Sequence, residues 1–249
     1  MHVAAVVLAA GKGLRFSSAR FKVPKPLVAI RGRPLIIYSL ETLSRHPGIK
    51  DIILVVNPKN SGGIAEKARK YRIGKIKKLV FGGHRRQDSV ANGLKHVNPK
   101  AGLVLIHDGV RPFINKEIVS SVIKEARKSG AAITGVPVKG TIKEVARSGS
   151  HQVTSNFIVK KTLNRDALWE AQTPQVFRKD LILKAYKRFG REEVTDDASL
   201  VEKLGAKVSV VLGSYNNIKI TTPEDLVIAK AIAKKLIDKR NAYCRCPTE

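Results

Sequence analysis

The stretch from Val3 to Arg15 reads Val-Ala-Ala-Val-Val-Leu-Ala-Ala-Gly-Lys-Gly-Leu-Arg, and the rest of the chain is organised around it. Residues 3–8 are an uninterrupted apolar run, which predicts a strand buried on both faces. The loop that follows has little side-chain bulk, so its backbone N–H groups can approach a ligand closely. Lys12 and Arg15 indicate that this ligand is anionic, and Lys25, between two prolines, adds a further cation.

Length and composition predict a globular protein. The chain has 249 residues, of which 43% are hydrophobic, and this is enough to bury the core of one large α/β domain over residues 1–249. No apolar run reaches the roughly eighteen residues that a membrane span needs. The two cysteines, Cys244 and Cys246, predict no disulfide framework, so we expect a cytoplasmic location.

The chain is strongly basic. Its 47 Lys and Arg residues against 20 Asp and Glu residues give a formal net charge of +27. Such an excess admits nucleic acid, an anionic membrane or acidic small substrates as partners. The densest basic patches, 59–78 and 230–240, lack the interleaved aromatic residues of a single-strand binder, and no zinc-finger or RRM-type signature is present. Composition alone does not choose between these partners.

Apolar runs alternate with amphipathic segments along most of the chain. We expect strands over Val3–Leu8, Asp51–Val56, Lys78–Phe81, Leu103–Ile106, Ala131–Val136 and Lys207–Leu212. We expect helices over Pro34–Leu43, Ser61–Tyr71, Gln87–His96, Lys116–Lys128, Lys179–Arg188 and Asp197–Leu204, and a last helix that opens at Thr222-Pro223. This alternation predicts an α/β fold with a Rossmann-like, doubly wound, mostly parallel sheet and helices on both faces.

Residues 139–168 interrupt the alternation. β-Branched residues alternate on either side of an Arg-Ser-Gly-Ser turn, which is a hairpin signal. A hairpin at this place would project from the sheet, and an exposed two-stranded arm is only marginally stable alone. We therefore predict a projecting β-arm that pairs with a partner chain.

Three predicted loops follow carboxyl ends of strands, where doubly wound sheets bind ligands. They span 9–25, 82–89 and 107–112. The first is neither a dinucleotide fingerprint nor a P-loop, because it lacks the third glycine of one and the Ser or Thr after Gly-Lys of the other. Ser89 could bind a base edge or simply lie early in a helix after a glycine-rich turn. Asp108 could bind Mg²⁺ or a ribose hydroxyl, or cap a turn and pair with Arg111.

The chemistry that these loops favour is direct transfer at phosphorus. The six histidines do not cluster at metal-ligand spacing, and no Ser/His/Asp order or nucleophile elbow is present. This argues against covalent catalysis. Cations around a nucleoside triphosphate suit in-line transfer, in which the protein positions the substrates and neutralises developing charge.

Several motifs occur in the order and at the spacing of a known family. They are Leu8-Ala-Ala-Gly-x-Gly-x-Arg15 with Pro24-Lys25, Gly82-Gly-x-x-Arg-x-x-Ser-Val90, His107-Asp-x-x-Arg-Pro112, Arg165-x-x-Leu-Trp169, Gln172-Thr-Pro-Gln175, Thr195-Asp-Asp197 and Asn217-Ile-Lys-Ile-Thr221. With these motifs the chain resembles, from Val3 to about Ala233, the 2-C-methyl-D-erythritol 4-phosphate cytidylyltransferases of non-mevalonate isoprenoid biosynthesis.

The resemblance implies a reaction. CTP and 2-C-methyl-D-erythritol 4-phosphate would give 4-diphosphocytidyl-2-C-methyl-D-erythritol and pyrophosphate, by attack of the substrate phosphate on the α-phosphorus of CTP. Mg²⁺ would lie across the triphosphate, with its protein ligands left open. The resemblance also implies a homodimer in which the arm crosses to the neighbouring chain and completes its active site.

The resemblance implies residue roles as well. The catalytic residues would be Arg15 and Lys25, which stabilise charge on the α-phosphate, and Arg165 and Lys219, which orient the attacking oxygen. The nucleotide would be bound by Ala9, Ala10, Gly11, Gly13, Gly83, Ser89 and Asp108. The alcohol phosphate would be held by Asp108, Arg111, Thr141, Arg165, Thr195 and Lys219.

One departure from the family pattern concerns His84 and Arg85, which stand where a more acidic pair is expected. It affects side-chain contacts to the base, not backbone contacts. The nearest alternative function is a ribitol-5-phosphate cytidylyltransferase, but the Leu168-Trp169 pair favours the methylerythritol enzyme. A more remote alternative, a nucleic-acid-binding protein on a degenerate nucleotidyltransferase fold, is supported only by the net charge, and the cations at motif positions argue against it.

Overall fold

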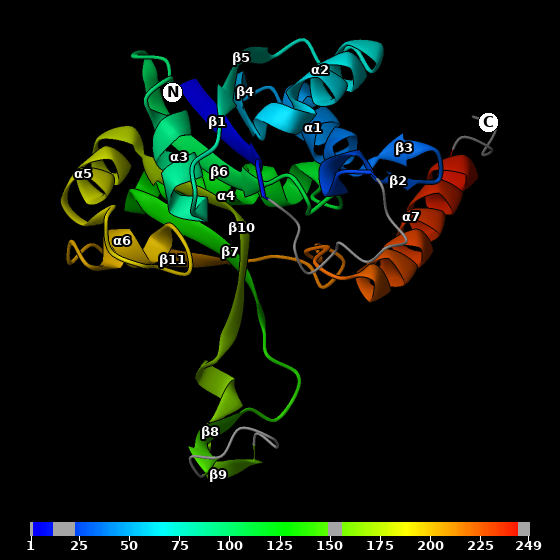
Figure 1. Ribbon diagram of the computed structural model, residues 1–249. Helices are drawn as coiled ribbons and strands as arrows, with labels where there is room; N and C mark the ends of the chain where they lie inside the picture. Colours follow the sequence, from blue (N-terminus) through cyan, green and yellow to red (C-terminus); the bar gives the residue numbers. More distant parts are fainter. Residues whose placement is uncertain (1, 12–22, 149–155, 244–249) are drawn as a thin grey trace.

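A seven-stranded sheet with the order β11-β7-β10-β6-β1-β4-β5 forms the centre of the molecule (Figure 1). The computed structural model describes residues 2–11, 23–148 and 156–243. The strands are β1 (His2–Ala9), β4 (Ile49–Val56), β5 (Ile76–Phe81), β6 (Ala101–Asp108), β7 (Ala131–Pro137), β10 (Trp169–Arg178) and β11 (Ser209–Leu212). Neighbouring strands are parallel except where β10 pairs antiparallel with β6 and β7. The predicted mostly parallel α/β sheet is confirmed.

Strand β1 lies between β6 and β4, and its residues 3–9 are buried. Because successive side chains of a strand point to opposite faces, β1 serves two cores. Val3, Ala5 and Val7 belong to the cluster on one face, and Ala4 and Val6 belong to the cluster on the other. The continuous apolar run of the sequence therefore reflects a strand with both faces covered.

Helices cover both faces of the sheet. The core that contains Val3 includes residues of α1 (Leu35–Arg45), α2 (Ser61–Lys70) and α4 (Lys116–Ser129). The core that contains Val6 includes residues of α3 (Arg86–Leu94), α5 (Lys179–Phe189) and α6 (Ala198–Glu202). A third, smaller core joins α7 (Pro223–Tyr243) to the short strand β2 (Ala29–Ile30), which pairs with β3 (Arg33–Pro34). Single 3-10 turns are η2 (Lys25–Leu27), η3 (Pro58–Asn60) and η4 (Arg165–Ala167).

Strand β10 is the main element that the sequence analysis did not identify. It enters the sheet between β6 and β7, and it carries the buried polar residues Gln172, Thr173 and Gln175. Their side chains are hydrogen-bonded: the Gln175 amide, for example, donates to the Asp196 carboxylate at 2.8 Å. A search for apolar strands misses such a segment, because three of its buried positions are filled by polar side chains that have partners, and the buried apolar pair Val176 and Phe177 is too short to be recognised.

The segment 139–168, for which we expected an arm, contains the antiparallel pair β8 (Lys143–Ser148) and β9 (Asn156–Thr162). The hairpin extends well away from the central sheet, below β7 and β10 in the view of Figure 1. Its apolar side chains are exposed: Phe157 by 55%, Ile158 by 60% and Val159 by 53%. Residues 149–155, which include Gly149 and Ser150 of the predicted turn, lie outside the described residues, as do Cys244 and Cys246. Among the described residues, no helix is long and apolar enough to cross a membrane.

His107, near the end of β6, fixes this strand to β10. The Thr173 hydroxyl accepts the Asp108 N–H at 3.1 Å and lies 3.0 Å from Nδ1 of His107. Nε2 of His107 donates to the Arg111 carbonyl at 3.2 Å, because a carbonyl oxygen can only accept, so in the neutral ring Nδ1 accepts the proton of the Thr173 hydroxyl. Complete burial is the main reason why the pKa of His107 is lowered to about 4. The charges of Arg111 and Arg86 act in the same direction, whereas Asp108 and the hydrogen bond to the Arg111 carbonyl oppose it.

Gly93 of α3 packs so closely on the sheet that a side chain would not fit. A Cβ there would lie 2.6 Å from Val6 Cγ1 and 3.0 Å from Val55 Cγ2. We expect Gly93→Ala to lower the free energy of unfolding by about 1–3 kcal/mol, although alanine favours helices. The control is Gly62→Ala in α2, where a Cβ meets nothing within 4 Å and where we expect a gain of up to about 1 kcal/mol. Urea denaturation measures both, and equal effects of the two substitutions would contradict this packing.

The low pKa of His107 predicts a pH-dependent stability. Below pH 6.5 the unfolded chain binds a proton at this ring, which the native state excludes until the pH reaches about 4. The stability should therefore decrease as the pH falls through this window, by up to about 3 kcal/mol from His107 alone. His107→Gln should show a shallower decrease in denaturation experiments at several pH values. Parallel curves for the two proteins would disprove the neutral, buried ring.

Candidate functional site

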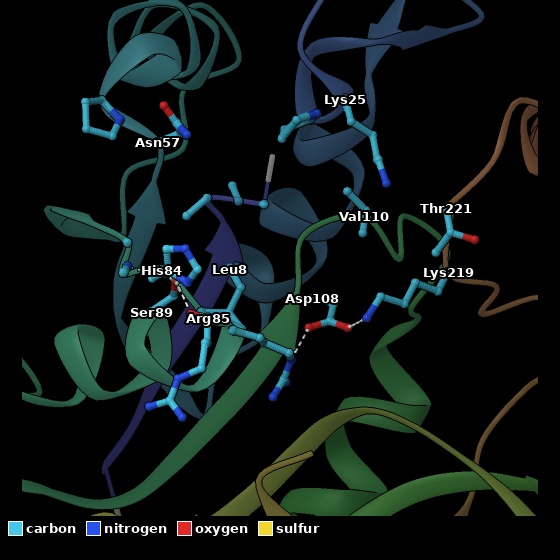
Figure 2. A pocket seen from close by; sticks show the side chains of 18 residues that line it. Leu8, Lys25, Asn57, His84, Arg85, Ser89, Asp108, Val110, Lys219 and Thr221 are labelled. Carbon is cyan, nitrogen blue, oxygen red and sulfur yellow. Dashed lines mark hydrogen bonds and ion pairs between the residues drawn. The ribbon is translucent and has the colours of Figure 1, made fainter. Parts of the chain in front are cut away.

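A cavity of about 500 Å³ opens where β1, β4, β5 and β6 end (Figure 2). Its walls come from the segments that follow these strands and from two segments near them. The lining residues are Leu8–Gly11, Lys25, Pro26, Asn57, Pro58, Gly82–Arg86, Ser89, Asp108, Val110, Lys219 and Thr221. This is the place at which an open parallel sheet forms its ligand sites.

The structure brings together in this cavity many of the residues that the sequence analysis proposed. They are Ala9, Ala10, Gly11, Lys25, Gly83, Ser89, Asp108 and Lys219. Gly13 and Arg15 lie outside the described residues. Figure 2 shows Lys25 and Lys219 on one side of the cavity, across from His84 and Ser89. The cavity therefore has a cationic side and a side formed by the glycine-rich segment.

Close packing leaves no room for a side chain at Gly82 or Gly83. A Cβ at Gly82 would lie 2.3 Å from Ala10 Cβ, and one at Gly83 would lie 2.3 Å from Asp88 Cβ. The Gly83 N–H donates to the Ser89 hydroxyl at 3.1 Å, and this hydroxyl donates to the Arg85 carbonyl at 3.2 Å. The second alternative for this loop is therefore confirmed: Ser89 lies early in α3 and stabilises a glycine turn. The same turn lines the cavity, and the contact of Ser89 with a base edge stays a prediction.

Asp108 is the acidic centre of the cavity. One carboxylate oxygen lies 3.2 Å from Nε of Arg86, and the other lies 2.7 Å from Nζ of Lys219. Burial alone would raise the pKa of Asp108, but Arg86 and Lys219 together hold it well below its usual range. Asp108 is therefore ionised at neutral pH. The ion pair with Arg111 that we considered is not formed: the Arg111 guanidinium donates to the Asn217 carbonyl at 2.8 Å.

Arg86 has a second anionic partner, which the sequence analysis did not identify. Its Nη2 lies 2.9 Å from Oδ2 of Asp197, whose side chain is fully buried. The other oxygen of Asp197 accepts the Tyr186 hydroxyl at 2.5 Å. Burial would lower the pKa of Arg86, but Asp197 and Asp108 raise it well above its usual value. Arg86 and Asp197 both stand in motifs quoted above, and no spacing in the sequence indicates that they meet.

The remaining predicted residues do not line the cavity. Thr141 and Arg165 are exposed on the arm, where Arg165 donates to the Lys139 carbonyl at 3.0 Å. Thr195 is exposed between α5 and α6, and Arg111 is buried, with its backbone N–H bonded to the Asp108 carbonyl. Within one chain, the predicted set for the alcohol phosphate is therefore dispersed: two residues line the cavity, two lie on the arm, and Arg111 and Thr195 lie in neither.

Among the described residues, no group of three or more His, Cys, Asp or Glu side chains is arranged to hold a metal ion. Asp108 carries the one carboxylate among the described lining residues. The described part of the chain therefore provides at most a partial set of oxygen ligands for a hard cation such as Mg²⁺.

The family model and the relatives that match this chain all carry the name of one family. The family model described as 2-C-methyl-D-erythritol 4-phosphate cytidylyltransferase matches residues 3–235. The chain is 46% identical to the protein of that name from Syntrophus aciditrophicus over 236 residues, which is 94% of this chain and 96% of the relative. It is 44% identical to the one from Shouchella clausii, over 94% of this chain and 98% of the relative.

The fold is shared with solved structures. The 4-diphosphocytidyl-2C-methyl-D-erythritol synthase of Anaerococcus prevotii superposes with a TM-score of 0.78 at 37% sequence identity, over 93% of this chain and 96% of that one. The resemblance found in the motifs thus holds over nearly the whole chain, in sequence and in fold. The chain belongs to the 2-C-methyl-D-erythritol 4-phosphate cytidylyltransferase family.

Proposed function

We propose that the cavity binds CTP and that the chain transfers the CMP group to 2-C-methyl-D-erythritol 4-phosphate, with release of pyrophosphate. The proposal rests mainly on the composition of one cavity. The cavity is lined by Lys25, Lys219 and the ionised Asp108, and by the small-residue segments 9–11 and 82–83. The names of the relatives support the choice of both substrates.

The nucleotide half of the site is formed by segments 9–11 and 82–83. Among the described residues, none comes within 4 Å of a Cβ built at Gly11, so no described side chain fills the space beside this glycine. The base would lie along the Gly82–Gly83 backbone, and Asp108 would accept hydrogen bonds from ribose or alcohol hydroxyls. The triphosphate would extend toward Lys25, where a point charge can follow the phosphate oxygens.

The transfer needs no protein nucleophile. A phosphate oxygen of the alcohol phosphate forms the new bond to the α-phosphorus of CTP, and the bond from this phosphorus to the β-phosphate oxygen breaks. The attacking phosphate is already largely ionised at neutral pH, because its second pKa is about 6. Lys25, together with Arg15, would neutralise charge on the α-phosphate, and Lys219 would orient the attacking oxygen.

Mg²⁺ would supply further charge neutralisation on the triphosphate. The residues present fit such an ion only if phosphate oxygens and water complete its shell, since Asp108 is the one carboxylate among the described lining residues. The contribution of the chain to such a metal site is the carboxylate of Asp108, which Arg86 and Lys219 keep ionised.

The alcohol half of the site would be completed by a second copy of the chain. Arg165 and Thr141 are exposed on an arm whose apolar side chains, Phe157 and Ile158 among them, have no cover in the described chain. A homodimer in which the arm of each chain lies against the other would cover these side chains. It would also bring Arg165 and Thr141 toward the partner's cavity.

The substrate assignment predicts the outcome of a turnover assay. Pyrophosphate release from CTP should be fast with 2-C-methyl-D-erythritol 4-phosphate and slow or absent with ribitol 5-phosphate. Turnover of ribitol 5-phosphate alone would replace the assignment with that of the related cytidylyltransferase. No pyrophosphate release with either alcohol, combined with tight and salt-dependent nucleic-acid binding, would replace it with the nucleic-acid-binding alternative.

The role of Lys25 predicts a loss of turnover without a loss of folding. Lys25→Ala should lower kcat by about 100- to 1000-fold, since single groups that stabilise the transition state contribute on this scale. The control Lys124→Ala removes the same charge from the exposed side of α4 and should leave kcat unchanged. Steady-state kinetics and thermal melting test both variants, and near-normal turnover of Lys25→Ala would contradict the role.

A further inference from the structure

We propose that Asp197, which does not line the cavity, positions Asp108 and Lys219 through Arg86. The inference rests on the proposed function, because it concerns how the transferring site is held in place. Asp197 is a positioning residue in this account: it touches Arg86 and Tyr186, and it is not expected to touch either substrate.

A row of paired side chains extends from the core to the cavity. The Tyr186 hydroxyl donates to Asp197, Asp197 pairs with Arg86, Arg86 pairs with Asp108, and Asp108 pairs with Lys219. The charges alternate in sign along the row. Asp197 is fully buried, the side chains of Asp108 and Arg86 are 8% and 28% exposed, and that of Lys219 is 38% exposed. The row therefore leads from the protein interior to the substrate side.

Arg86 can fix the position of Asp108 relative to that of Asp197. Its guanidinium is planar, and its donors point in fixed directions. Asp197 Oδ2 lies 2.9 Å from Nη2 in an ion pair without hydrogen-bond geometry, and Asp108 accepts a hydrogen bond from Nε at 3.2 Å. Because one rigid group makes both contacts, the position of the first restricts where the second can form. Asp108, in turn, restricts the position of the Lys219 ammonium group, whose Nζ lies 2.7 Å from Oδ2 of Asp108. A point charge in place of Arg86 would balance the two carboxylates without setting their relative orientation.

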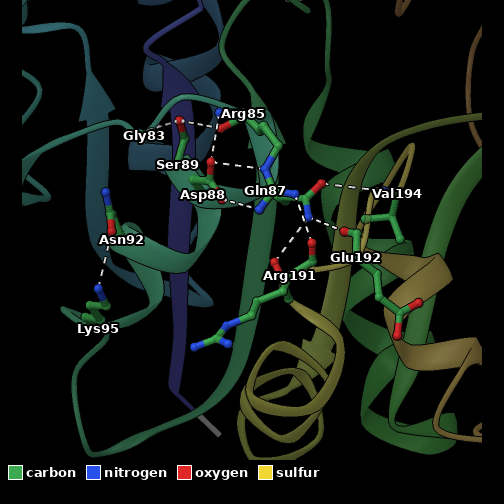
Figure 3. Close-up of polar contacts among 11 residues, drawn as sticks. Gly83, Arg85, Gln87, Asp88, Ser89, Asn92, Lys95, Arg191, Glu192 and Val194 are labelled. Carbon is green, nitrogen blue, oxygen red and sulfur yellow. Dashed lines mark hydrogen bonds and ion pairs between the residues drawn. The ribbon is translucent and has the colours of Figure 1, made fainter.

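The segment that carries Asp197 is itself fastened to the start of α3 (Figure 3). The Gln87 amide donates to the Gly190 carbonyl at 3.1 Å and also to the Glu192 carbonyl. Arg85, on the other side of Arg86, donates to the Arg191 carbonyl at 3.0 Å. The contacts of Arg85 and Gln87 thus hold segment 190–197 against the helix that presents Arg86, and they limit how far Asp197 can shift.

A stabilising role alone does not account for this arrangement. Buried ion pairs are costly to desolvate, and apolar residues of similar size often give equal or greater stability. Removing only one partner is different, because it leaves a buried charge without compensation. These two facts allow stability and positioning to be separated by experiment.

The test compares Arg86→Met with the double variant Arg86→Met/Asp197→Asn. The single variant leaves Asp197 buried and unpaired, so its melting temperature should fall sharply. The double variant removes that charge, and the side-chain amide introduced by Asp197→Asn keeps an oxygen for the Tyr186 hydroxyl, so its melting temperature should return toward that of the natural protein. Its kcat should nevertheless stay lower by about tenfold or more, because Asp108 and Lys219 have lost their anchor. The loss should be larger in kcat than in the KM for CTP.

Recovery of kcat together with stability in the double variant would overturn the proposal and leave Arg86 and Asp197 with a structural role. Because Arg86 itself lines the cavity, Asp197→Asn alone decides between a direct role of Arg86 and a positioning role of Asp197, since it keeps Arg86 and removes only the charge behind it. We expect its kcat to be lower by about tenfold or more, and a smaller loss overturns the proposal.

The matched control is Arg178→Met/Asp180→Asn. This exposed pair has a contact of 2.7 Å and does not line the cavity, so its kcat should equal that of the natural protein. The natural protein is assayed in parallel and separates the two questions. If it does not turn over CTP, the proposed function fails, whereas full turnover by both the natural protein and the double variant refutes only the positioning role.

Discussion

The carboxylate of Asp108, held between Arg86 and Lys219, is the interaction on which the rest of the site depends. A buried carboxylate is costly unless cations and hydrogen-bond donors surround it. The fold meets this requirement by ending β6 at Asp108, beginning α3 at Arg86 and bringing Lys219 back from beyond β11. The backbone of Asp108 is fixed as well, because Thr173 of β10 accepts its N–H. The cavity is therefore built around a charge that the surrounding elements keep ionised.

Much of this arrangement can be predicted from the sequence where one local pattern suffices. The apolar run 3–8 gives the central strand, and the glycines of segment 82–83 give a turn that no side chain could enter. Strand β10 could not be predicted in this way, because Gln172, Thr173 and Gln175 interrupt the apolar pattern of its buried positions. The contact between Arg86 and Asp197 could not be predicted either. It joins residues far apart in the chain and arises only when α3 and α6 pack on the same face of the sheet.

The division of the predicted alcohol-binding residues also has a physical basis. Lys219 and Asp108 lie in the cavity, whereas Arg165 is on an arm that no other described part of the chain covers. Such an arm buries little apolar surface within its own chain and is only marginally stable by itself, so contact with a partner surface would set its position. The same chain would then supply the nucleotide half of one site and part of the alcohol half of another, and the site would depend on assembly as well as on folding.

A crystal structure of the protein with CTP would show whether the nucleotide binds in the cavity beside Asp108. We expect the base along the Gly82–Gly83 backbone, the ribose near Asp108 and the triphosphate beside Lys25. Nucleotide bound at another surface, or bound in the cavity with its triphosphate directed away from Lys25, would contradict this binding mode.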